Sequence, residues 1–549
     1  MKFFNKQILF FSGIIIIIII LIPILIEVYW EKNTPEDFFF TGFLQSDQIT
    51  YTALFRSVFE RGNGFSYSYP YANPGAENPP VIFQIPFTLL AWLWKLSGGS
   101  LIIPWEIVRI IFGVGFFILL FIFASEVLRL FYPKKEKCLE FQWYIFLFFL
   151  ILATGGGVAW FISLIKYNIY RFTETESLLN YMEVFTNVEE SYHWWFLNIF
   201  RNIFYPLEME YHFFFFLAIV GVIKKMPVFV LLGQIMACMS GVFVGIEIST
   251  ILIVYFLLES LIQRKKEIVI HLLGSILIFL IFIYYYKIFL SRFPVAKSLV
   301  EQHKTNIHLL IPIREYISAY GILLILVPLI FLLKKTRNTI FNKDSGRLLI
   351  IWLIVVISLM LNDKWLGKRS IQPPHFTRGY LYTVLLTISA VGIFPYWEKL
   401  LNRQKKSAFV ILLFAFLIFI PDNVLFVIEQ LSEQPHLFVL SIPKETKEAL
   451  DFLNSIPERE VAFSPERRFG DQIPAFSPHN STYAQIYATA FDDEKTFTDK
   501  DFTNFVKEYS ISLVVLPKIY IKYFYARGFI SDKWKLIFEN SMWSIYRPP

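Results

Sequence analysis

Long apolar blocks constrain this chain more than any other feature of its sequence. The first block, residues 8–28, would form about 30 Å of helix at roughly 1.5 Å per residue. Further blocks reach the 17–25 or so residues that a bilayer core requires. Of the 549 residues 56% are hydrophobic and only 17% are charged, whereas a soluble protein would sit nearer to about a quarter charged. The sequence therefore predicts a polytopic α-helical membrane protein with about 11–13 spans.

Basic residues gather in short clusters between the apolar blocks. These clusters lie at 133–137, 224–225, 264–266, 334–337 and 403–406, and such clusters are expected on the cytoplasmic side. The net charge of +7 therefore indicates membrane orientation and not a nucleic-acid partner. No small-residue cleavage site follows the first block, so we expect an uncleaved anchor with a cytoplasmic N-terminus. The only two cysteines, Cys138 and Cys238, do not suggest a disulfide framework.

The segment 80–96 is apolar but short, and Pro86 interrupts it. It is either an ordinary span or a helix at the outer face. The charge pattern favours a helix that does not cross, because the later basic clusters then all fall inside. The predicted spans are 8–29, 101–131, 142–165, 206–223, 227–245, 248–262, 268–289, 314–333, 347–362, 379–397 and 407–428.

The composition changes after the last apolar block. We expect a membrane domain over 1–430, with a first outer loop at 30–80, and a soluble extracytoplasmic α/β domain over 443–549. Periodicity in this tail predicts helices at 446–455 and 501–509 and strands at 460–463, 511–516 and 543–546.

Two acids on the first outer loop are candidates for chemistry. Asp47 lies in Ser-Asp-Gln ahead of a helix-compatible stretch, and Glu77 precedes Asn78-Pro79-Pro80. A carboxylate can accept or orient the proton of an attacking hydroxyl or amine, and it can ligate a divalent cation. Asp47 could equally cap the following helix, and Glu77 could be a solvated loop residue. Arg109, where the next span begins, either snorkels or grips a lipid phosphate with its planar fork.

Together these features resemble the GT-C superfamily of membrane glycosyltransferases, in particular the bacterial lipid A aminoarabinose transferases and the protein O-mannosyltransferases. The resemblance covers residues 8 to about 130 best. It implies that Asp47 on the first outer loop is the catalytic Asp, that Glu77-Asn78-Pro79-Pro80 is the Glu-x-Pro-Pro element, and that Arg109 is the span-opening arginine. It also implies a site that faces away from the cytoplasm.

The resemblance implies a second acid near a later span. We expect it at Glu208 or Glu210, in preference to Glu189-Glu190; no Asp, the family's usual residue, stands in either stretch. His193 and His212 are either ligands or interfacial residues beside aromatic belts. The later loop 364–378 is basic although it is predicted to lie outside. Lys368, Arg369 and above all Arg378 would hold the donor phosphate, as in the family, or would bind anionic headgroups.

The resulting hypothesis is a glycosyltransferase of the cell (inner) membrane that uses a polyprenyl-phosphate-linked sugar, in a single inverting displacement. The acceptor would be a lipid, a glycan or a protein, and membrane lipids would surround the chain. A divalent cation is possible, but no ligand cluster specifies a metal site.

Two alternatives stay open for the whole chain. One is a transporter of a lipid-linked glycan, for which Glu247 is the mid-span ionisable residue that stands out. The other is a catalytically inactive relative that acts in binding or assembly. The tail, whose segment 471–477 also resembles GT-C outer domains, would bind the acceptor or serve as a packing element.

Overall fold

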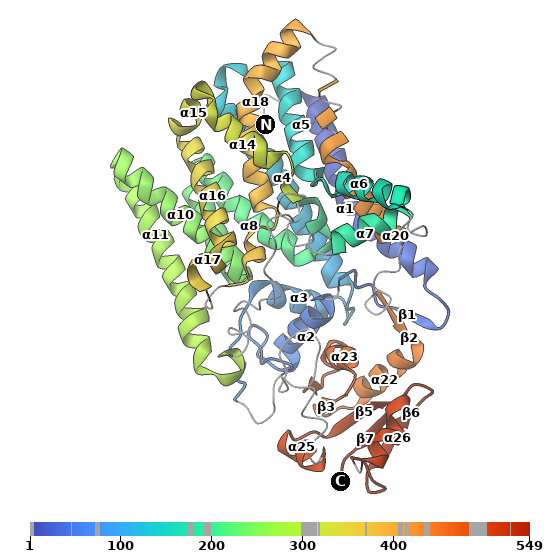
Figure 1. Ribbon diagram of the computed structural model, residues 1–549. Coiled ribbons are helices and arrows are strands. Elements are labelled where there is room, and N and C mark those ends of the chain that lie inside the picture. Colours follow the sequence, from blue (N-terminus) through green and yellow to red (C-terminus); the bar gives the residue numbers. More distant parts are fainter. Residues whose placement is uncertain are drawn as a thin grey trace. The chain divides into compact units, whose positions relative to one another are not determined.

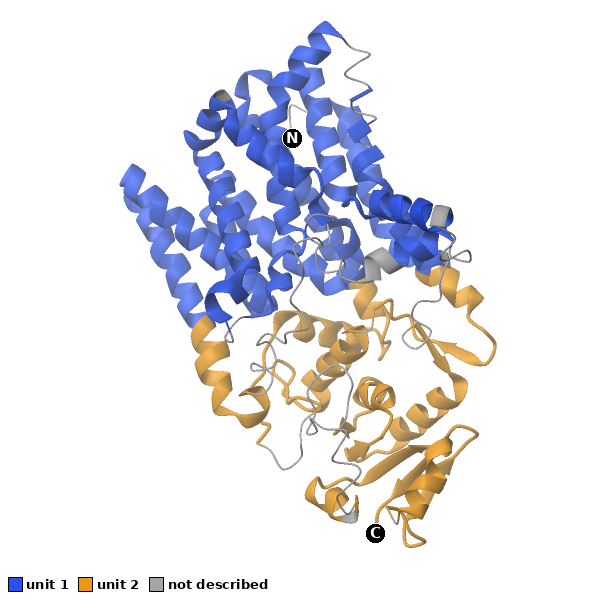
Figure 2. Cartoon of the chain, viewed as in Figure 1, with its two compact units in different colours: residues 1–26, 108–282, 304–434 blue, residues 27–107, 283–303, 435–549 orange. Residues whose placement is uncertain are grey.

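Two compact units make up the chain in the computed structural model (Figure 2). The membrane unit comprises residues 1–26, 108–282 and 304–434, and the loop–tail unit comprises residues 27–107, 283–303 and 435–549. The structure describes residues 5–45, 47–71, 77–173, 180–190, 199–297, 316, 319–367, 371–404, 410–411, 414–415, 417–432, 440–482, 502–527 and 529–549. One division falls between Gln434 and Pro435, near the predicted boundary, and residues 27–107 group with the tail. The predicted domains stay a prediction.

Helices form the membrane unit (Figure 1). They are α1 (Lys6–Asn33), α4 (Ile103–Phe131), α5 (Leu139–Thr154), α6 (Ala159–Thr173), α7 (Tyr181–Glu190), η3 (Ile199–Phe204), α8 (Pro206–Ile223), α9 (Pro227–Ser240), α10 (Val242–Gln263), α11 (Lys266–Ile283), α14 (Leu323–Leu332), α15 (Lys334–Phe341), α16 (Asp344–Met360), α17 (Asn362–Leu366), η8 (Pro373–Phe376), α18 (Tyr380–Arg403) and α20 (Pro421–Ser432). The unit boundaries fall inside α1, α4 and, by one residue, α11.

Six helices in the described part of the chain are long and apolar enough to cross a membrane, or seven if one bent pair counts as a single span. The six are Lys6–Asn33, Ile103–Phe131, Pro206–Ile223, Val242–Gln263, Lys266–Arg292 and Pro373–Arg403. The helical membrane class is thus confirmed. The full set of 11–13 crossings stays a prediction, since α9 and α14 are apolar but shorter and parts of 314–333 and 407–428 lie outside the described residues.

Glycines break two segments that the sequence predicts as continuous spans. The expected span 142–165 is the bent pair, α5 and α6, whose axes meet at 59°. At the bend, Gly155 approaches its neighbours so closely that a Cβ atom would lie 2.2 Å from the Tyr382 hydroxyl. Similarly, the predicted span 227–245 ends at Gly241, an extended residue between α9 and α10. The missing side chain permits the close approach at Gly155, whereas Gly241 has an extended conformation that other residues also adopt.

The loop–tail unit joins the first loop to the end of the chain. Its short sheet pairs β1 (Phe38–Phe40) with β2 (Ser441–Pro443) in antiparallel register. Two helices follow in the first loop, α2 (Asp47–Glu60) and α3 (Ile85–Leu96). The twelve residues of α3 extend about 18 Å at roughly 1.5 Å per residue, too short for a hydrocarbon core. This length supports the prediction that 80–96 does not cross.

A five-stranded mixed sheet organises the tail, in the order β4-β3-β5-β7-β6. Its strands are β3 (Val461–Phe463), β4 (Asn480–Ser481), β5 (Leu513–Pro517), β6 (Lys535–Glu539) and β7 (Trp543–Arg547), and its helices are α22 (Lys444–Ser455), α23 (Arg467–Phe476), α25 (Phe502–Glu508) and α26 (Lys518–Ala526). Strands β4, β3 and β5 run parallel, and β7 joins β5 and β6 antiparallel. The predicted strands are confirmed by β3, β5 and β7.

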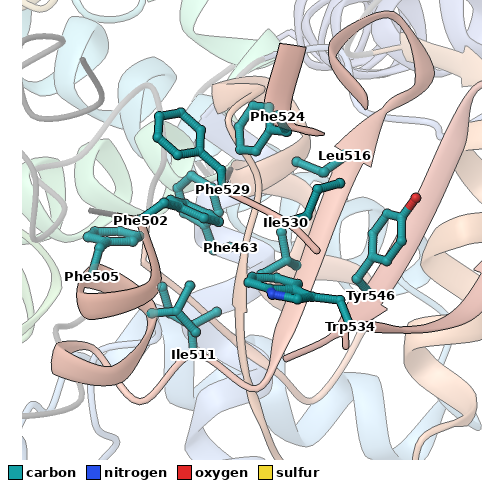
Figure 3. Packing of buried hydrophobic residues seen from close by; sticks show 12 residues of the cluster. Phe463, Phe502, Phe505, Ile511, Leu516, Phe524, Phe529, Ile530, Trp534 and Tyr546 are labelled. Atoms are coloured by element: carbon teal, nitrogen blue, oxygen red, sulfur yellow. The ribbon is translucent and has the colours of Figure 1, made fainter. Parts of the chain in front are cut away.

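Alternating side chains of the sheet feed two cores. Along β5, Val514 and Leu516 join a cluster that contains Phe502, whereas Leu513 and Val515 join a cluster on the other face. Figure 3 shows the aromatic residues of the first cluster gathered beside the strands. The two-residue period of a strand explains how one short element stabilises both faces.

Candidate functional site

Arg378 lies where the membrane unit changes from η8 to α18. It follows the Pro373-Pro374 pair and precedes Gly379, which adopts a left-handed conformation with φ +76° at the start of α18. Only 19% of the Arg378 side chain is exposed. A guanidinium that is this enclosed in a span-forming segment needs partners.

Glu208 is the first of these partners. It stands in the first turn of α8, which begins at Pro206 after the extended residue Tyr205. A carboxylate is favourable there because the first turn of a helix carries a partial positive charge. Arg378 donates from Nη1 to Glu208 Oε1 in a charge-assisted hydrogen bond. Two of the sequence-predicted site residues, 170 positions apart, are thereby brought together.

His375 is the second partner of Arg378, and the sequence reasoning missed it. Its Nδ1 lies 2.5 Å from Arg378 Nη2. Because a guanidinium only donates hydrogen bonds, Nδ1 must accept, which places the proton of the neutral ring on Nε2. The ring stacks on Phe243 of α10 at 4.1 Å and 7°. The Pro-Pro-His-Phe sequence one turn before Arg378 was the available signal.

The second predicted acid of α8, Glu210, has a different environment. It is fully buried and accepts a hydrogen bond of 2.9 Å from the Ser240 hydroxyl at the end of α9. His212, also fully buried, packs its ring against Phe116 and Tyr380 at 5.4 and 5.0 Å. It therefore lies within aromatic packing, the environment of a core residue.

Glu247 of α10 is a further buried acid near this cluster. Its exposed fraction is 0%, and neither carboxylate oxygen has a hydrogen-bond partner among the described residues. It interacts electrostatically with Arg378. Glu208 pairs directly with this guanidinium, and no ion pair between Glu247 and Arg378 is seen among the described residues.

Arg109 is fully buried in α4. A side chain that snorkels would carry its charged group to water, so the complete burial of Arg109 argues against that interpretation. Phosphate binding by Arg109 stays a prediction.

Asp47 is the first helical residue of α2 and is partly buried. Next to it, Gln45 and Gln48 cap the helix reciprocally: the Gln48 amide donates to the Gln45 carbonyl at 3.0 Å, and the Gln45 amide donates to Gln48 Oε1 at 2.9 Å. A carboxylate at this end is stabilised by the helix dipole. Asp47 lies in the loop–tail unit and Arg378 in the membrane unit, so their predicted common chamber stays a prediction.

Glu77 is exposed, whereas its neighbour Asn78 fixes the loop. Asn78 accepts from the Tyr69 amide at 3.0 Å and donates to the Tyr69 carbonyl at 2.9 Å. The Glu-x-Pro-Pro element therefore holds its loop through the residue after the acid. The catalytic role of Glu77 stays a prediction.

Several predicted residues lie outside the part of the chain that the structure describes. They are Lys368, Arg369 and His193, together with the side chains of Glu189 and Glu190. Within the described part, no group of three or more His, Cys, Asp or Glu side chains is arranged to hold a metal ion.

Comparison with known proteins supports the fold. No protein-family model and no curated protein matches the sequence. Among solved structures, the Archaeoglobus fulgidus oligosaccharyltransferase in complex with Zn and sulfate is similar, with a TM-score of 0.50, 13% identity, and 97% of this chain and 72% of that chain covered. The chain therefore shares its fold with this oligosaccharyltransferase.

Two further structures match with lower scores. Archaeal oligosaccharyltransferase AglB from Archaeoglobus fulgidus, in complex with an inhibitory peptide and a dolichol-phosphate, has a TM-score of 0.46 at 12% identity, with 94% of this chain and 70% of that chain covered. ArnT from Cupriavidus metallidurans in the apo state has a TM-score of 0.47 at 12% identity, with 96% of this chain and 97% of that chain covered.

Proposed function

We propose that this protein is an integral-membrane glycosyltransferase that takes its sugar from a polyprenyl-phosphate donor. The observation that carries the proposal is the enclosed ion pair of Arg378 with Glu208, in a fold shared with an oligosaccharyltransferase. A guanidinium held by Glu208 and His375 is preorganised, and preorganised donors stabilise charge that develops on a leaving group. Here the leaving group would be the lipid phosphate.

The proposed reaction is one displacement with inversion. A hydroxyl or amine of the acceptor attacks the anomeric carbon while the bond from that carbon to the phosphate oxygen breaks. Asp47 takes the proton of the nucleophile or orients it. Arg378 and Arg109 neutralise the released phosphate, which stays attached to its lipid. The donor class follows from the predicted outward-facing site, because nucleotide sugars are cytosolic.

The acceptor would be a lipid, a glycan or a protein on the extracytoplasmic face. Glu77 and Glu210 would assist as secondary acids, and Lys368 and Arg369 would extend the phosphate site. A divalent cation is compatible with carboxylate chemistry, and titration with EDTA and Mn²⁺ would test it.

Purified protein and a panel of polyprenyl-phosphate-linked sugars test the proposal. Asp47→Asn should lower the transfer rate by about 10²- to 10⁴-fold. Arg378→Lys should lower it by about 10²-fold, because an ammonium cannot reproduce the two-pronged contact to Glu208 and His375. Arg129→Lys is the matched control, an arginine of the same unit that pairs with Glu126. A wild-type rate for Asp47→Asn would contradict the catalytic assignment.

One observation favours transport of a lipid-linked glycan as the second candidate. Glu247 is buried in a candidate span without a hydrogen-bond partner in the described chain, and such residues mark pathways in transporters. Movement of a labelled polyprenyl-linked glycan across a proteoliposome, without any transfer product, would select this alternative. Loss of this movement in the Glu247→Gln variant would show that transport depends on Glu247.

A further inference from the structure

The helix that carries Asp47 is held at its other end by the tail. Asp47 is the first residue of α2, and Arg61 follows the last residue, Glu60. Both ends belong to the loop–tail unit, as does the tail segment 475–480, the end of α23 and the turn into β4. The contacts between α2 and this segment are therefore internal to one compact unit.

Arg61 makes most of these contacts. Its Nη2 donates to the carbonyls of Pro478 and His479 at 2.7 and 2.5 Å, and its Nε donates to Asn480 Oδ1 at 2.6 Å. Its Nη1 donates to the Ser57 hydroxyl of α2 at 3.0 Å. The guanidinium therefore bonds the last turn of α2 and three successive residues of the tail.

Arg56, one turn earlier, repeats the arrangement. It donates from Nη1 to the Ala475 carbonyl at 2.9 Å and pairs with Glu60 at 2.6 Å on its own helix. The exposed fractions are 5% for Arg56 and 4% for Arg61. Burial lowers the pKa of Arg61 to about 10, so its guanidinium remains charged at neutral pH.

The kind of acceptor determines how firmly these arginines couple α2 to the tail. Three of the four acceptors in the segment 475–480 are main-chain carbonyls, which move only if the backbone of that segment moves. A buried guanidinium that loses its acceptors is costly, so α2 must follow any displacement of this segment. An exposed ion pair would have no such effect, because water would replace the lost partner.

We infer that Arg61, with Arg56, is a positioning residue through which the tail segment 475–480 sets the location of α2 and hence of Asp47. This inference depends on the proposed function only for its catalytic consequence. The tail then helps to position the site. An acceptor substrate that displaced the segment 475–480 would move α2 and thereby change the transfer rate.

Hydrogen exchange of the full-length protein, measured beside transfer kinetics, tests the inference. In Arg61→Ala the amides of 48–58 should exchange at least 10-fold faster, and kcat should fall at least 10-fold with the donor KM within twofold. Arg61→Lys keeps the positive charge but loses the planar guanidinium with its several donors. Its exchange rates and its kcat should lie between those of the wild type and of Arg61→Ala. The control is Arg547→Ala, an arginine of the same unit that pairs with Glu460 and should leave both readouts unchanged.

The two readouts separate the possible failures. Unchanged exchange over 48–58 in Arg61→Ala would overturn the inference whatever the activity. Faster exchange with a wild-type kcat would overturn the positioning role while leaving the mechanical link. If Asp47→Asn is fully active, the proposed catalytic role fails even where the exchange result holds.

Discussion

The imidazole of His479 is locked into one protonation state by its hydrogen bonds. Its Nδ1 accepts from the Glu460 amide at 3.0 Å, and its Nε2 lies 2.7 Å from the Leu453 carbonyl. Because a carbonyl only accepts, Nε2 carries the proton and the ring is neutral. Burial lowers the pKa of His479. Protonation of Nδ1 would place an N–H donor against the N–H of Glu460, and this hydrogen bond would be lost.

The neutral ring of His479 predicts acid sensitivity of the loop–tail unit. The unfolded chain takes up a proton at this histidine near pH 6.5, whereas the folded chain takes it up only at lower pH. The free energy of unfolding should therefore fall as the pH decreases below about 6.5, by at most about 1.4 kcal/mol per pH unit. Pulse proteolysis in urea at pH 7.5 and 5.5 measures it.

His479→Gln is the matched variant, since an amide side chain can accept and donate but does not titrate. It should flatten this pH dependence. An equally steep decline in His479→Gln would show that another group is responsible.

The residue scale also shows what the sequence could reveal of the site. Arg378 and Glu208 were predictable because a charge at the end of an apolar block is costly and needs a reason. Their pairing was not predictable, since it depends on how α8 and α18 pack. His375 was missed for the same reason: one histidine beside two prolines has no distinctive pattern until its neighbours are known.

At the scale of elements, glycine decides how closely α8 and α9 pack. A Cβ atom on Gly233 would lie 2.6 Å from the Ala218 nitrogen and 2.7 Å from the Phe214 carbonyl oxygen. Both neighbours are backbone atoms, which cannot turn away as a side chain can. Small residues at such positions let membrane helices approach each other.

Gly233→Ala should therefore destabilise the membrane unit, by about 1–3 kcal/mol as for other overpacked cores. Gly13→Ala is the control, because a Cβ atom on Gly13 of α1 would meet nothing within 4 Å. Thermal unfolding in detergent compares the two. A melting temperature that is equally high in both variants would show that the α8–α9 contact can relax.

Periodicity predicted elements well where one pattern continued and poorly where it stopped. Strands β5 and β7 are each buried at four consecutive residues, and the apolar run of β5 was visible in the sequence. The edge strand β6 was missed, because only Ile537 and Phe538 of its five residues are partly buried and no alternation results. The bends at Gly155 and Gly241 were missed because apolar composition continues across them.

At the scale of the whole molecule, the orientation in the membrane is the open prediction. Cys138 is exposed and Cys238 is buried, which provides a native probe beside the basic cluster 133–137. In the predicted orientation a membrane-impermeant maleimide should label Cys138 only when the cytoplasmic face is accessible. In a Cys138→Ser background, Lys533→Cys at an exposed tail position should be labelled in intact cells. The opposite labelling pattern would invert the assignment.

The grouping of the first loop with the tail was beyond sequence reasoning. The bonds that join them, from Arg61 to Asn480 and from Tyr71 to Asp471, connect residues 419 and 400 positions apart. Local periodicity carries no information on such pairs. The change of composition after residue 430 lies close to the unit boundary between Gln434 and Pro435, but composition could not show that residues 27–107 group with the tail.

The pairing of β1 with β2 requires an even number of membrane crossings between the two strands. Main-chain hydrogen bonds cannot reach across a hydrocarbon core about 30 Å thick, so Phe39 and its partner Ile442 lie on one face of the bilayer. The polypeptide that leaves residue 41 must return to this face by residue 440, and it must traverse the bilayer an even number of times in between. A pattern in which 80–96 stays on one side satisfies this condition, whereas one additional traverse there would require a second elsewhere.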